Sequence, residues 1–398
     1  MLRPAVMILI YLVISAAAAA LACGLARRAF PGRGRRAVTG ISLGLCLAAL
    51  AFPLAGGLLP DGPAGRFFQR WGNVLLGPAL YFSGALALLW LFSWIPRRVL
   101  RRRSGGTWRL PRRWAAGVLA VLLAMTAAVN IAGAVNARTV RVTRYELPKQ
   151  TLSQTGPLRI VLIADLHIGV NSSPALYERM VRRVNEQEPD LILVAGDIVT
   201  SCYGAMEDPE AYASVLRQMK AAYGVFAVYG NHDMEEPLLG GFSLTGAGNA
   251  VRHPDMDAFV ASCGWKLLRD ESVILPDLCG LRLAGRRDES RPGDGVTRRA
   301  ELKELLKGTD PAEPVLLLQH EPAELEDLGS LGVDLALSGH THDGQIFPGN
   351  VLARIMGPQS YGLKRWGDCG VLVTSGVGFY GPPVRVGTVS EIAVLDLK

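Results

Sequence analysis

The chain has 398 residues, a formal net charge of +7 and a hydrophobic fraction of 49%. This length allows two or three domains, one of which could bury a full hydrophobic core. Because the basic residues flank apolar segments and do not alternate with aromatic residues, the charge argues against nucleic-acid binding and indicates membrane topology. The six cysteines fit neither a disulfide framework nor a zinc finger, but one disulfide stays open among Cys202, Cys263, Cys279 and Cys369.

The first third of the chain, residues 1–135, is predicted to be an all-α transmembrane anchor with four helices. Four apolar segments without a charged side chain each reach the roughly 20 residues that a bilayer crossing requires. Four such runs in succession are unusual for buried core helices, and the absence of ionisable residues within them disfavours a transporter or proton path. The predicted spans are residues 5–26, 37–59, 73–95 and 114–135.

Arginine placement predicts the orientation of this anchor. The loops 27–36 and 96–113 hold five and eight arginines, whereas the loop 60–72 holds two. The positive-inside rule then puts the first and third loops in the cytoplasm, and the chain after the fourth span outside. The basic residues that follow this span argue mildly against that orientation: Arg138, Arg141, Arg144 and Lys149. We expect a multi-pass protein of the cell membrane whose C-terminal domain is extracytoplasmic.

Processing of the first segment is an alternative interpretation. Residues 16–22 resemble the end of a signal peptide, and residues 20–23 loosely resemble a lipoprotein cleavage box. Cleavage at either place would leave the loop with five arginines outside. An uncleaved anchor is therefore favoured.

A polar linker, residues 136–157, is predicted to lead into an α/β domain over residues 158–398. In this domain short apolar runs alternate with helical stretches, as in an α/β sandwich. The predicted helices are residues 174–187 and 209–220. The predicted strands are residues 159–164, 190–195, 225–229, 281–284, 315–318, 333–337, 371–374 and 391–395.

Five of the predicted strands end in side chains of the kinds that bind metals. In α/β sheets the carboxyl ends of the strands form the edge at which ligands bind. Each short motif alone is common, but five in one domain have no comparable structural explanation. The motifs are Asp165-x-His167, Gly196-Asp197, Gly230-Asn231-His232-Asp233, His320 and Gly339-His340-Thr341-His342. The sequence therefore predicts a site for divalent metal ions.

Together these motifs resemble the calcineurin-like metallophosphoesterase family, and most closely its membrane-anchored bacterial phosphoesterases. The resemblance covers roughly residues 158–398 and implies the α/β sandwich of that family with a dinuclear metal site. It implies that Asp165, His167 and His342 hold the first metal. It also implies that Asn231, His320 and His340 hold the second, with Asp197 bridging. This mixed set of oxygen and nitrogen donors suits Mn²⁺, Fe²⁺ or Zn²⁺ better than Ca²⁺ or Mg²⁺.

The resemblance also implies roles beyond the metals. His232 resembles the family's non-ligand histidine, which donates to a phosphate oxygen or the leaving group, and Asp233 could orient its imidazole. The chain departs from the subgroup at Asp343, where glycine is usual; this change could alter metal preference or the rim of the pocket. Residues 234–251 could form a lid, a membrane-dipping cap or an ordinary loop.

Three arginines are candidates for binding the phosphate, because a guanidinium fork matches its geometry. They are Arg286, Arg287 and Arg385, for which an ordinary surface role is the alternative.

The predicted function is a membrane-anchored, dimetal phosphoesterase that hydrolyses phosphate mono- or diesters by attack of a metal-activated hydroxide. The expected partners are the lipid bilayer and a phosphate ester, lipid-linked or from the cell envelope, but no nucleic acid. Lipid-linked nucleotide sugars, which some members of the subgroup hydrolyse, are met on the cytoplasmic side, so either that substrate or the predicted orientation must give way. The competing hypothesis is a non-catalytic, metal-binding scaffold that retains the fold.

Overall fold

The structure is a computed structural model of the whole chain, and its described residues fall into ten segments. They are residues 19–30, 32–59, 62–104, 111–147, 152, 155–200, 203–236, 238–239, 242–243 and 251–397.

The chain divides into two compact units, which we call the helical unit and the sheet unit. The helical unit contains Met1–Ala132, Leu238–Leu244 and Gly381–Pro383. The sheet unit contains Gly133–Pro237, Thr245–Tyr380 and Val384–Lys398.

In the helical unit, α2 (Gly32–Leu58) packs against α3 (Pro63–Ser104) at a pair of glycines. A Cβ atom on Gly56 would lie 2.8 Å from the backbone nitrogen of Gln69, so only glycine allows this approach. The ring centroids of Phe52 and Phe68 are 5.1 Å apart in an edge-to-face arrangement beside it. The unit also contains most of α4 (Arg112–Ala137) and a short hairpin of β5 (Leu238–Leu239) and β6 (Phe242–Ser243).

Two helical segments are long and apolar enough to span a membrane: Pro63–Phe92 in α3, with 30 residues, and Arg113–Ala137 in α4, with 25 residues. They correspond to the third and fourth predicted spans. The second predicted span is helical, but only Leu47–Leu58 qualifies as apolar, and it is too short. Most of the first predicted span lies outside the described residues. The structure thus supports two of the spans, and a four-helix transmembrane region is not confirmed.

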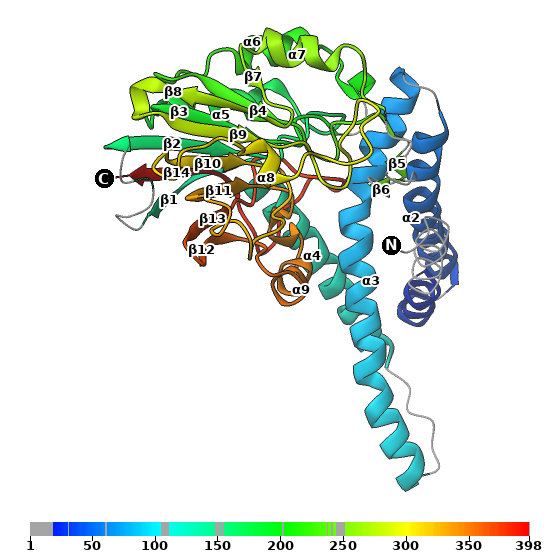
Figure 1. The fold of residues 1–398 in the computed structure, drawn as a ribbon. Helices are drawn as coiled ribbons and strands as arrows, with labels where there is room; N and C mark the ends of the chain where they lie inside the picture. Colours follow the sequence, from blue (N-terminus) through cyan, green and yellow to red (C-terminus); the bar gives the residue numbers. More distant parts are fainter. Residues whose placement is uncertain are drawn as a thin grey trace. The chain divides into compact units, whose positions relative to one another are not determined.

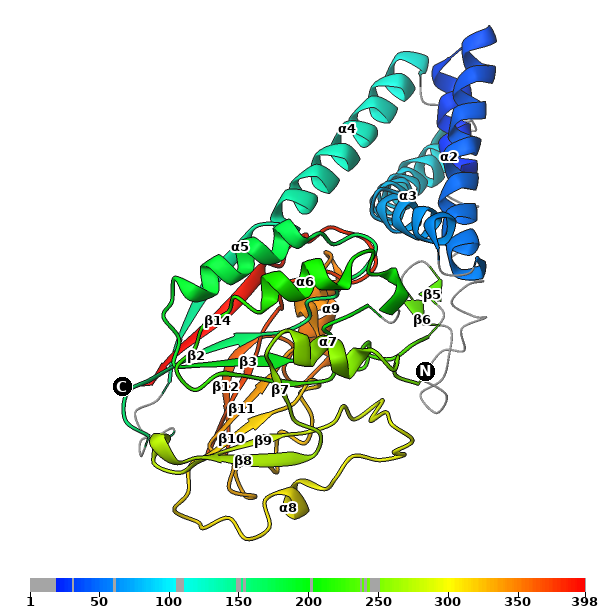
Figure 2. The same ribbon diagram turned by 90° about the horizontal axis from the view of Figure 1, so that it is seen from above.

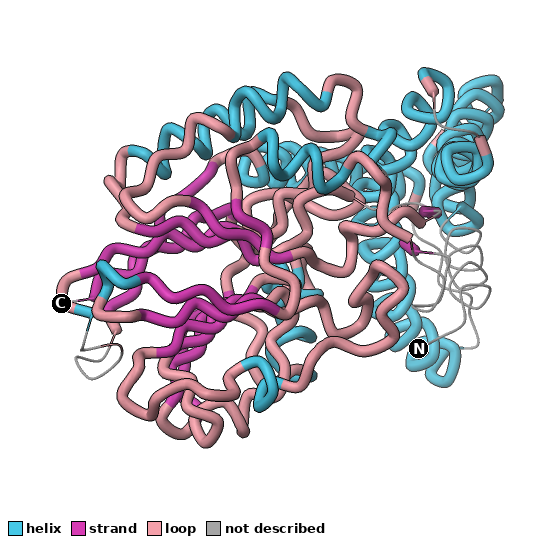
Figure 3. The backbone as a smooth tube through the Cα atoms, turned by 45° about the horizontal axis from the view of Figure 1, so that its top comes forward, coloured by secondary structure: helices cyan, strands magenta, loops and turns pink. Residues whose placement is uncertain are grey.

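The sheet unit confirms the predicted α/β sandwich, since its described part contains two six-stranded sheets (Figures 1 and 3). The first sheet runs in the order β1 (Val140–Glu146), β14 (Ser390–Leu397), β2 (Leu158–Ile163), β3 (Leu191–Ala195), β4 (Val225–Val228) and β7 (Lys266–Leu267). The second runs in the order β12 (Gly362–Trp366), β13 (Cys369–Val373), β11 (Leu335–Ser338), β10 (Val315–Leu318), β9 (Leu281–Gly285) and β8 (Glu271–Leu275).

Strand alternation explains how the two sheets pack. Successive side chains of a strand point to opposite faces, and in β2 Ile160 and Leu162 join residues of the second sheet in a common core, whereas Val161 and Ile163 join helical residues on the other face. The helices covering that other face are α5 (Pro174–Asn185), α6 (Pro209–Leu216) and α7 (Met256–Ser262), as Figure 2 shows.

The outer face of the second sheet packs against α8 (Leu302–Leu305) and nearby loops, and α9 (Gly349–Met356) follows the loop after β11. Three 3₁₀ turns complete the described elements: η2 (Tyr203–Ala205), η4 (Pro276–Leu278) and η5 (His342–Gly344).

The segment predicted as a linker contains an element that the sequence analysis missed. Val140–Glu146 form β1, which pairs in parallel with β14 from Val140 opposite Ser390 onward. The interpretation of residues 136–157 as linker alone is therefore wrong for these seven residues. The strand ties the chain that leaves α4 directly into the first sheet.

Parallel pairing determines where the site forms. In the first sheet β2, β3 and β4 run parallel, and in the second sheet β10 and β11 do. Their carboxyl ends therefore open at common edges of the sandwich, and all five predicted motifs follow these strands.

Candidate metal centre

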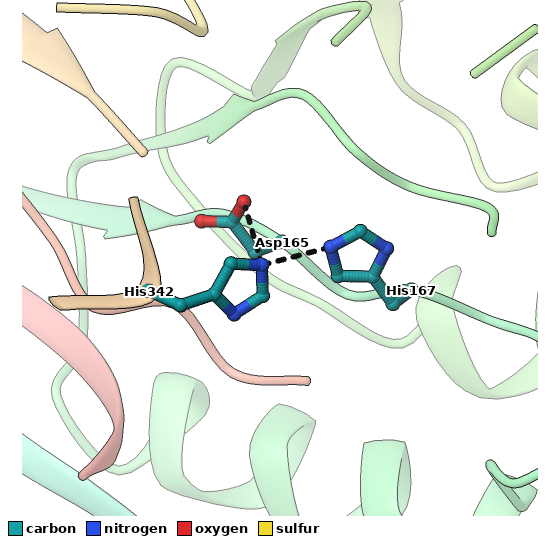
Figure 4. Close-up of side chains that lie close together, drawn as sticks. All are labelled: Asp165, His167 and His342. Atoms are coloured by element: carbon teal, nitrogen blue, oxygen red, sulfur yellow. Dashed lines mark hydrogen bonds and ion pairs between the residues drawn. The ribbon is translucent and has the colours of Figure 1, made fainter. Parts of the chain in front are cut away.

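The first of two side-chain clusters joins the loop after β2 to the loop after β11. The Nε2 atom of His342 lies 2.9 Å from Nε2 of His167 and 3.5 Å from Oδ1 of Asp165. Figure 4 shows both imidazoles and the carboxylate directed toward one another. All three residues are buried, and their donor atoms lie within 4.8 Å of one another, a spacing that suits one metal ion.

The second cluster contains Asn231, His320 and His340, from the loops after β4, β10 and β11. Oδ1 of Asn231 lies 3.2 Å from Nε2 of His320 and 2.9 Å from Nδ1 of His340. The two imidazole nitrogens are 3.3 Å apart. These donors face a common point, as ligands of a second ion would.

Asp197 connects the two clusters. Its Oδ2 atom lies 3.2 Å from Nε2 of His320 and 3.5 Å from Nε2 of His167. Its other oxygen, Oδ1, accepts a hydrogen bond of 2.8 Å from the backbone N–H of His232, which fixes the orientation of the carboxylate. One carboxylate thus reaches a ligand candidate in each cluster.

Backbone strain marks the same residues. Positive φ angles, which non-glycine residues rarely adopt, occur at five of the seven ligand candidates: Asp165, His167, Asp197, His340 and His342. Such conformations cost on the order of 1–3 kcal/mol each and persist where the surroundings impose them, often at functional sites.

Glycines beside the ligands allow the loops to approach closely. Gly196 has a φ of +77°, and a Cβ atom there would lie 2.7 Å from Nδ1 of His320. On Gly339, a Cβ atom would lie 2.6 Å from Oδ2 of Asp165. The motifs therefore require glycine next to the ligand candidate for steric reasons.

Burial keeps most of the imidazoles in the form that binds metals. It lowers the pKa of His167 to about 3 and, together with the charge of His320, the pKa of His340 to about 4. Burial also holds the pKa of His342 well below its usual value. At His320 burial acts in the same direction, but Asp197 outweighs it and raises the pKa well above the usual range. A cation bound there would replace that proton.

The comparisons with known proteins agree with this geometry. Residues 158–344 match the family described as calcineurin-like phosphoesterase. The chain contains a calcineurin-like metallophosphoesterase domain. The match ends at the residue after Asp343, so it includes all the ligand candidates.

Three curated relatives illustrate the similarity of the whole chain. A "Transmembrane protein with metallophosphoesterase domain" from Danio rerio is 33% identical over 287 residues, which cover 71% of this chain and 62% of that protein. An "Uncharacterized metallophosphoesterase" from Helicobacter pylori is 32% identical over 249 residues, 60% of each chain. A UDP-2,3-diacylglucosamine pyrophosphatase from Chlamydia trachomatis is 26% identical over 242 residues, 52% of this chain and 70% of that protein. This chain thus spans about three fifths of the length of the first two.

The residues of the phosphoesterase domain fit two divalent ions. Four imidazoles, two carboxylates and an amide oxygen from five separate loops converge, with donor atoms of the nitrogen and oxygen types that Mn²⁺, Fe²⁺ and Zn²⁺ share. Nδ1 of His320 lies 2.7 Å from the carbonyl oxygen of Ala195, so the Nδ1–H is held there and Nε2 faces the second cluster.

His232 lies at the partly open side of the phosphoesterase site, with 15% of its side chain exposed. Its ring stacks on that of Tyr380 at a centroid distance of 4.2 Å and lies 5.6 Å from the ring of His167. Its Nδ1 atom is 3.5 Å from Oε1 of Glu236, which forms an ion pair with Arg291.

The interpretation of Asp233 as the residue that orients the His232 imidazole is wrong. Both oxygens of its carboxylate accept backbone hydrogen bonds, from Val199 at 2.9 Å and Gly230 at 2.8 Å. Asp233 therefore joins the loops after β3 and β4, and Glu236 takes the position behind His232. No local pattern in the sequence points to Glu236 or Arg291, because their pairing depends on the fold.

The three candidate substrate arginines are held by the protein itself. Arg286 is 1% exposed, and its guanidinium pairs with Glu324 at 2.7 Å and donates to the carbonyl oxygen of Ala300. Arg287 pairs with Asp294 at 2.6 Å. Arg385 is fully buried, donates to several carbonyl oxygens, and lies with Nη2 3.2 Å from Nδ1 of His342. Burial excludes Arg286 and Arg385 from direct contact with a substrate.

Two further predictions concern segments near the domain's ligands. Asp343 is 2% exposed and forms a two-point ion pair with Arg354 of α9, at 3.0 and 2.6 Å, so it does not lie on the pocket rim. The suggested lid, residues 234–251, falls largely outside the described residues.

Proposed function

We propose that the chain is a membrane-anchored phosphoesterase that hydrolyses phosphate mono- or diesters at a pair of divalent ions. The observation that carries this proposal is the placement of Asp197, whose Oδ2 atom is 3.2 Å from His320 in one cluster and 3.5 Å from His167 in the other. A carboxylate shared between two sets of ligands is what a two-ion phosphoryl site requires.

Each group of the chain has a task in this proposal. When bound, two divalent ions would supply a water of lowered pKa and positive charge opposite the phosphoryl oxygens. Asp165, His167, Asn231, His320, His340 and His342 would hold the ions, and Asp197 would be shared between them. The His232 imidazole donates a hydrogen bond toward a phosphoryl or leaving oxygen, because Glu236 faces its Nδ1 atom and Tyr380 fixes its ring plane.

Arg291 is the arginine placed to assist this step. Its Nη1 atom donates to the carbonyl oxygen of Asn231 at 3.1 Å and pairs with Glu236. Its side chain is 13% exposed, and these two contacts hold the guanidinium near His232. It therefore replaces Arg286, Arg287 and Arg385 in the proposal as the residue that contributes positive charge to a bound phosphate.

The membrane anchor narrows the substrate class. Two segments qualify as spans, and the relative from Danio rerio is named a transmembrane protein. The name of the Chlamydia trachomatis relative describes action on a diacylated nucleotide sugar. We therefore propose a phosphate ester carried on a lipid or in the cell envelope as the substrate, met outside the cytoplasm if the predicted orientation holds.

Hydrolysis by the purified full-length protein in nanodiscs tests the proposed activity. Bis(p-nitrophenyl) phosphate and p-nitrophenyl phosphate serve as the di- and monoester, each with Mn²⁺, Fe²⁺ or Zn²⁺. We expect turnover that requires the metal, and we expect His232→Ala to retain the metal while losing about 100-fold or more in kcat. Metal binding by the wild type without turnover of any ester would instead support the scaffold hypothesis.

The predicted orientation has its own test. Glu146 is exposed on β1, and a cysteine introduced there reports on which side of the membrane the sheet unit lies. Labelling of Glu146→Cys by an impermeant maleimide in intact cells supports an extracytoplasmic domain. Protection until the cells are opened reverses the orientation and makes a cytoplasmic substrate the better proposal.

A further inference from the structure

Helix α9 exposes apolar side chains and buries a polar one, which is the reverse of the usual arrangement in a helix of a water-soluble domain. Its apolar side chains Val351, Leu352, Ile355 and Met356 are 43%, 52%, 74% and 82% exposed. Its buried member is the polar Asn350, whose amide donates to the carbonyl oxygen of Gly387 at 3.2 Å. We call the four outward apolar residues the α9 face. A contiguous apolar face of this kind marks a contact with another apolar phase.

The start of α9 is attached to the end of a membrane-spanning segment. Phe347, just before the helix, donates its backbone N–H to Val386 at 2.8 Å. Val386 in turn packs on Gly133 in the last turns of α4, where a Cβ atom would lie 2.8 Å from its side chain. Nearby, the amide of Asn136 donates to the carbonyl oxygens of Arg385 at 3.0 Å and Thr388 at 2.7 Å.

These contacts tie α9 to the C-terminal end of a segment that is long and apolar enough to cross a bilayer. The apolar segment Arg113–Ala137 ends at the residues that hold the 385–388 loop, and the same loop holds Asn350 and the chain before α9. Val135, in the last turn of α4, is itself 62% exposed. A helix fastened at the point where a span leaves the bilayer lies at the height of the membrane surface.

The other side of α9 is fastened to the metal centre. Arg354 forms its two-point ion pair with Asp343, the residue after the ligand candidate His342. Lys364 donates to the carbonyl oxygen of Pro358 at 3.3 Å, which places a positive charge just beyond the end of the helix, where anionic lipid headgroups would lie. One side of α9 thus contacts the loop that carries His342, and the α9 face remains available to contact lipid.

We propose that the α9 face inserts into the interfacial layer of the bilayer and thereby presents the metal centre to phosphate esters carried on lipids. The membrane contact follows from α9 and α4 alone, whereas the substrate class rests on the proposed phosphoesterase function. A second copy of the chain is the competing occupant of this face.

Depth-dependent quenching tests the membrane contact without any reference to activity. The full-length chain, with its exposed Cys279 replaced by serine, carries Met356→Cys labelled with a nitrobenzoxadiazole fluorophore in nanodiscs that contain acyl-chain spin-labelled lipid. The matched control is Ile274→Cys on β8, 49% exposed at the opposite edge of the second sheet from β12. We expect at least about twofold stronger quenching at position 356 than at 274. Equal quenching at the two positions overturns the proposal.

A matched pair of substrates tests the second half. Phosphatidyl-p-nitrophenol in the nanodisc and soluble bis(p-nitrophenyl) phosphate carry the same reporter group. The double variant Ile355→Glu and Met356→Glu should lose about tenfold on the lipid ester and stay within about twofold on the soluble one, because charge removes the face from the bilayer but leaves the ligands in place. Ile274→Glu is the control that should change neither.

The remaining outcomes each decide a point. Equal losses on both esters overturn the proposal and assign α9 a role in shaping the ligand loop. A wild-type dimer that the double variant converts to a monomer assigns the face to a second copy. If the wild type hydrolyses neither ester, the phosphoesterase proposal fails, yet the quenching result still decides whether α9 meets the membrane.

Discussion

The two halves of the metal centre differ in what lies behind their imidazoles. In the second cluster Nδ1 of His320 donates to the carbonyl oxygen of Ala195 at 2.7 Å, which orients the ring so that Nε2 faces the cluster. In the first cluster Nδ1 of His342 faces the guanidinium of Arg385 at 3.2 Å, and this donor favours the tautomer with its proton on Nε2. Nδ1 of His167 is buried without a hydrogen-bond partner among the described residues.

For the proposed two-ion site, this difference predicts that the two ions are held unequally. A cation in the second position would replace the Nε2 proton of a His320 ring that the carbonyl oxygen of Ala195 already orients, whereas one in the first position would also have to bind beside the guanidinium of Arg385. Burial lowers the pKa of Arg385 only to about 10, so it remains a buried positive charge beside the first position. We therefore expect the second ion to bind more tightly than the first.

Removing the carboxylate charge of Asp197 should weaken metal binding in both clusters. Asp197→Asn keeps the size of the side chain but removes the charge that faces His320 and His167. We expect turnover to fall by more than the roughly 100-fold that loss of an outer hydrogen-bond partner costs, and both ions to be lost. Elemental analysis of the purified variant together with its kcat measures this. Two ions retained per chain would contradict a bridging role.

The buried arginine behind the first cluster should matter for folding. Arg385 donates to the carbonyl oxygens of Gly378 at 2.6 Å, Val389 at 2.6 Å and Ser375 at 2.7 Å, and Arg385→Met leaves them unsatisfied. We expect a loss of at least about 3 kcal/mol in the free energy of unfolding, measured by urea unfolding in micelles. Arg287→Met, at a partly exposed site, is the control with a smaller loss. If Arg385 bound substrate instead, KM would rise and the unfolding midpoint would not move.

The sequence predicted the ligand candidates, whose side chains the structure brings together, because they occur in short motifs at strand ends. Asp165-x-His167 and His340-x-His342 are each complete within three residues, so the order of strands and motifs sufficed. Arg385 was assigned to the substrate and Glu236 was not identified, since their places depend on which loop packs behind which imidazole. Asp233 was misassigned for the same reason: proximity in sequence to His232 says nothing about the two backbone N–H groups that its carboxylate accepts.

The strand β1 and the exposed face of α9 were misread or missed, because each depends on the structure around it. The alternation Val140-Arg141-Val142 is a strand signal, but charged neighbours made the segment read as linker, and only pairing with β14 explains its stability. In α9 the apolar spacing of Val351, Leu352, Ile355 and Met356 also fits a helix that buries this face. Periodicity predicts the face and not the phase that it contacts.

Chelator titration measures the predicted inequality of the two ions directly. Increasing concentrations of a chelator should remove the ion of the first cluster at about 10–100-fold lower chelator strength than the ion of the second, the range that partners behind a ligand control. His342→Ala should abolish the more labile ion and leave the tighter one nearly unchanged. A single release step in the wild type, or loss of both ions in His342→Ala, would contradict the comparison.

Substitution of Glu236, which is not one of the ligand candidates, should leave both ions in place and still slow catalysis. Glu236→Gln keeps the shape of the side chain near Nδ1 of His232 but removes its charge. We expect kcat to fall about tenfold with unchanged metal content, because the group that faces the His232 imidazole loses its charge. A loss of metal would place Glu236 in the structure of the centre instead.

The smallest effect should come from substitution of Asp343, the residue at which the last motif departs from the pattern that it resembles. Asp343 has a φ of +48°, which glycine adopts at less cost, so Asp343→Gly relieves strain but loses the ion pair with the half-exposed Arg354. These effects oppose each other, and we expect the free energy of unfolding to change by less than about 1 kcal/mol. Asp343 follows His342, and its ion pair attaches α9 to the loop that carries this ligand candidate. Loss of the ion pair should therefore make the first ion a few-fold more labile. The second ion should not change, since the weaker attachment of α9 affects only the first cluster. An equal increase in the lability of both ions would show that the 340–343 loop moves as one body. The difference in affinity between the two ions would then depend on Arg385 alone.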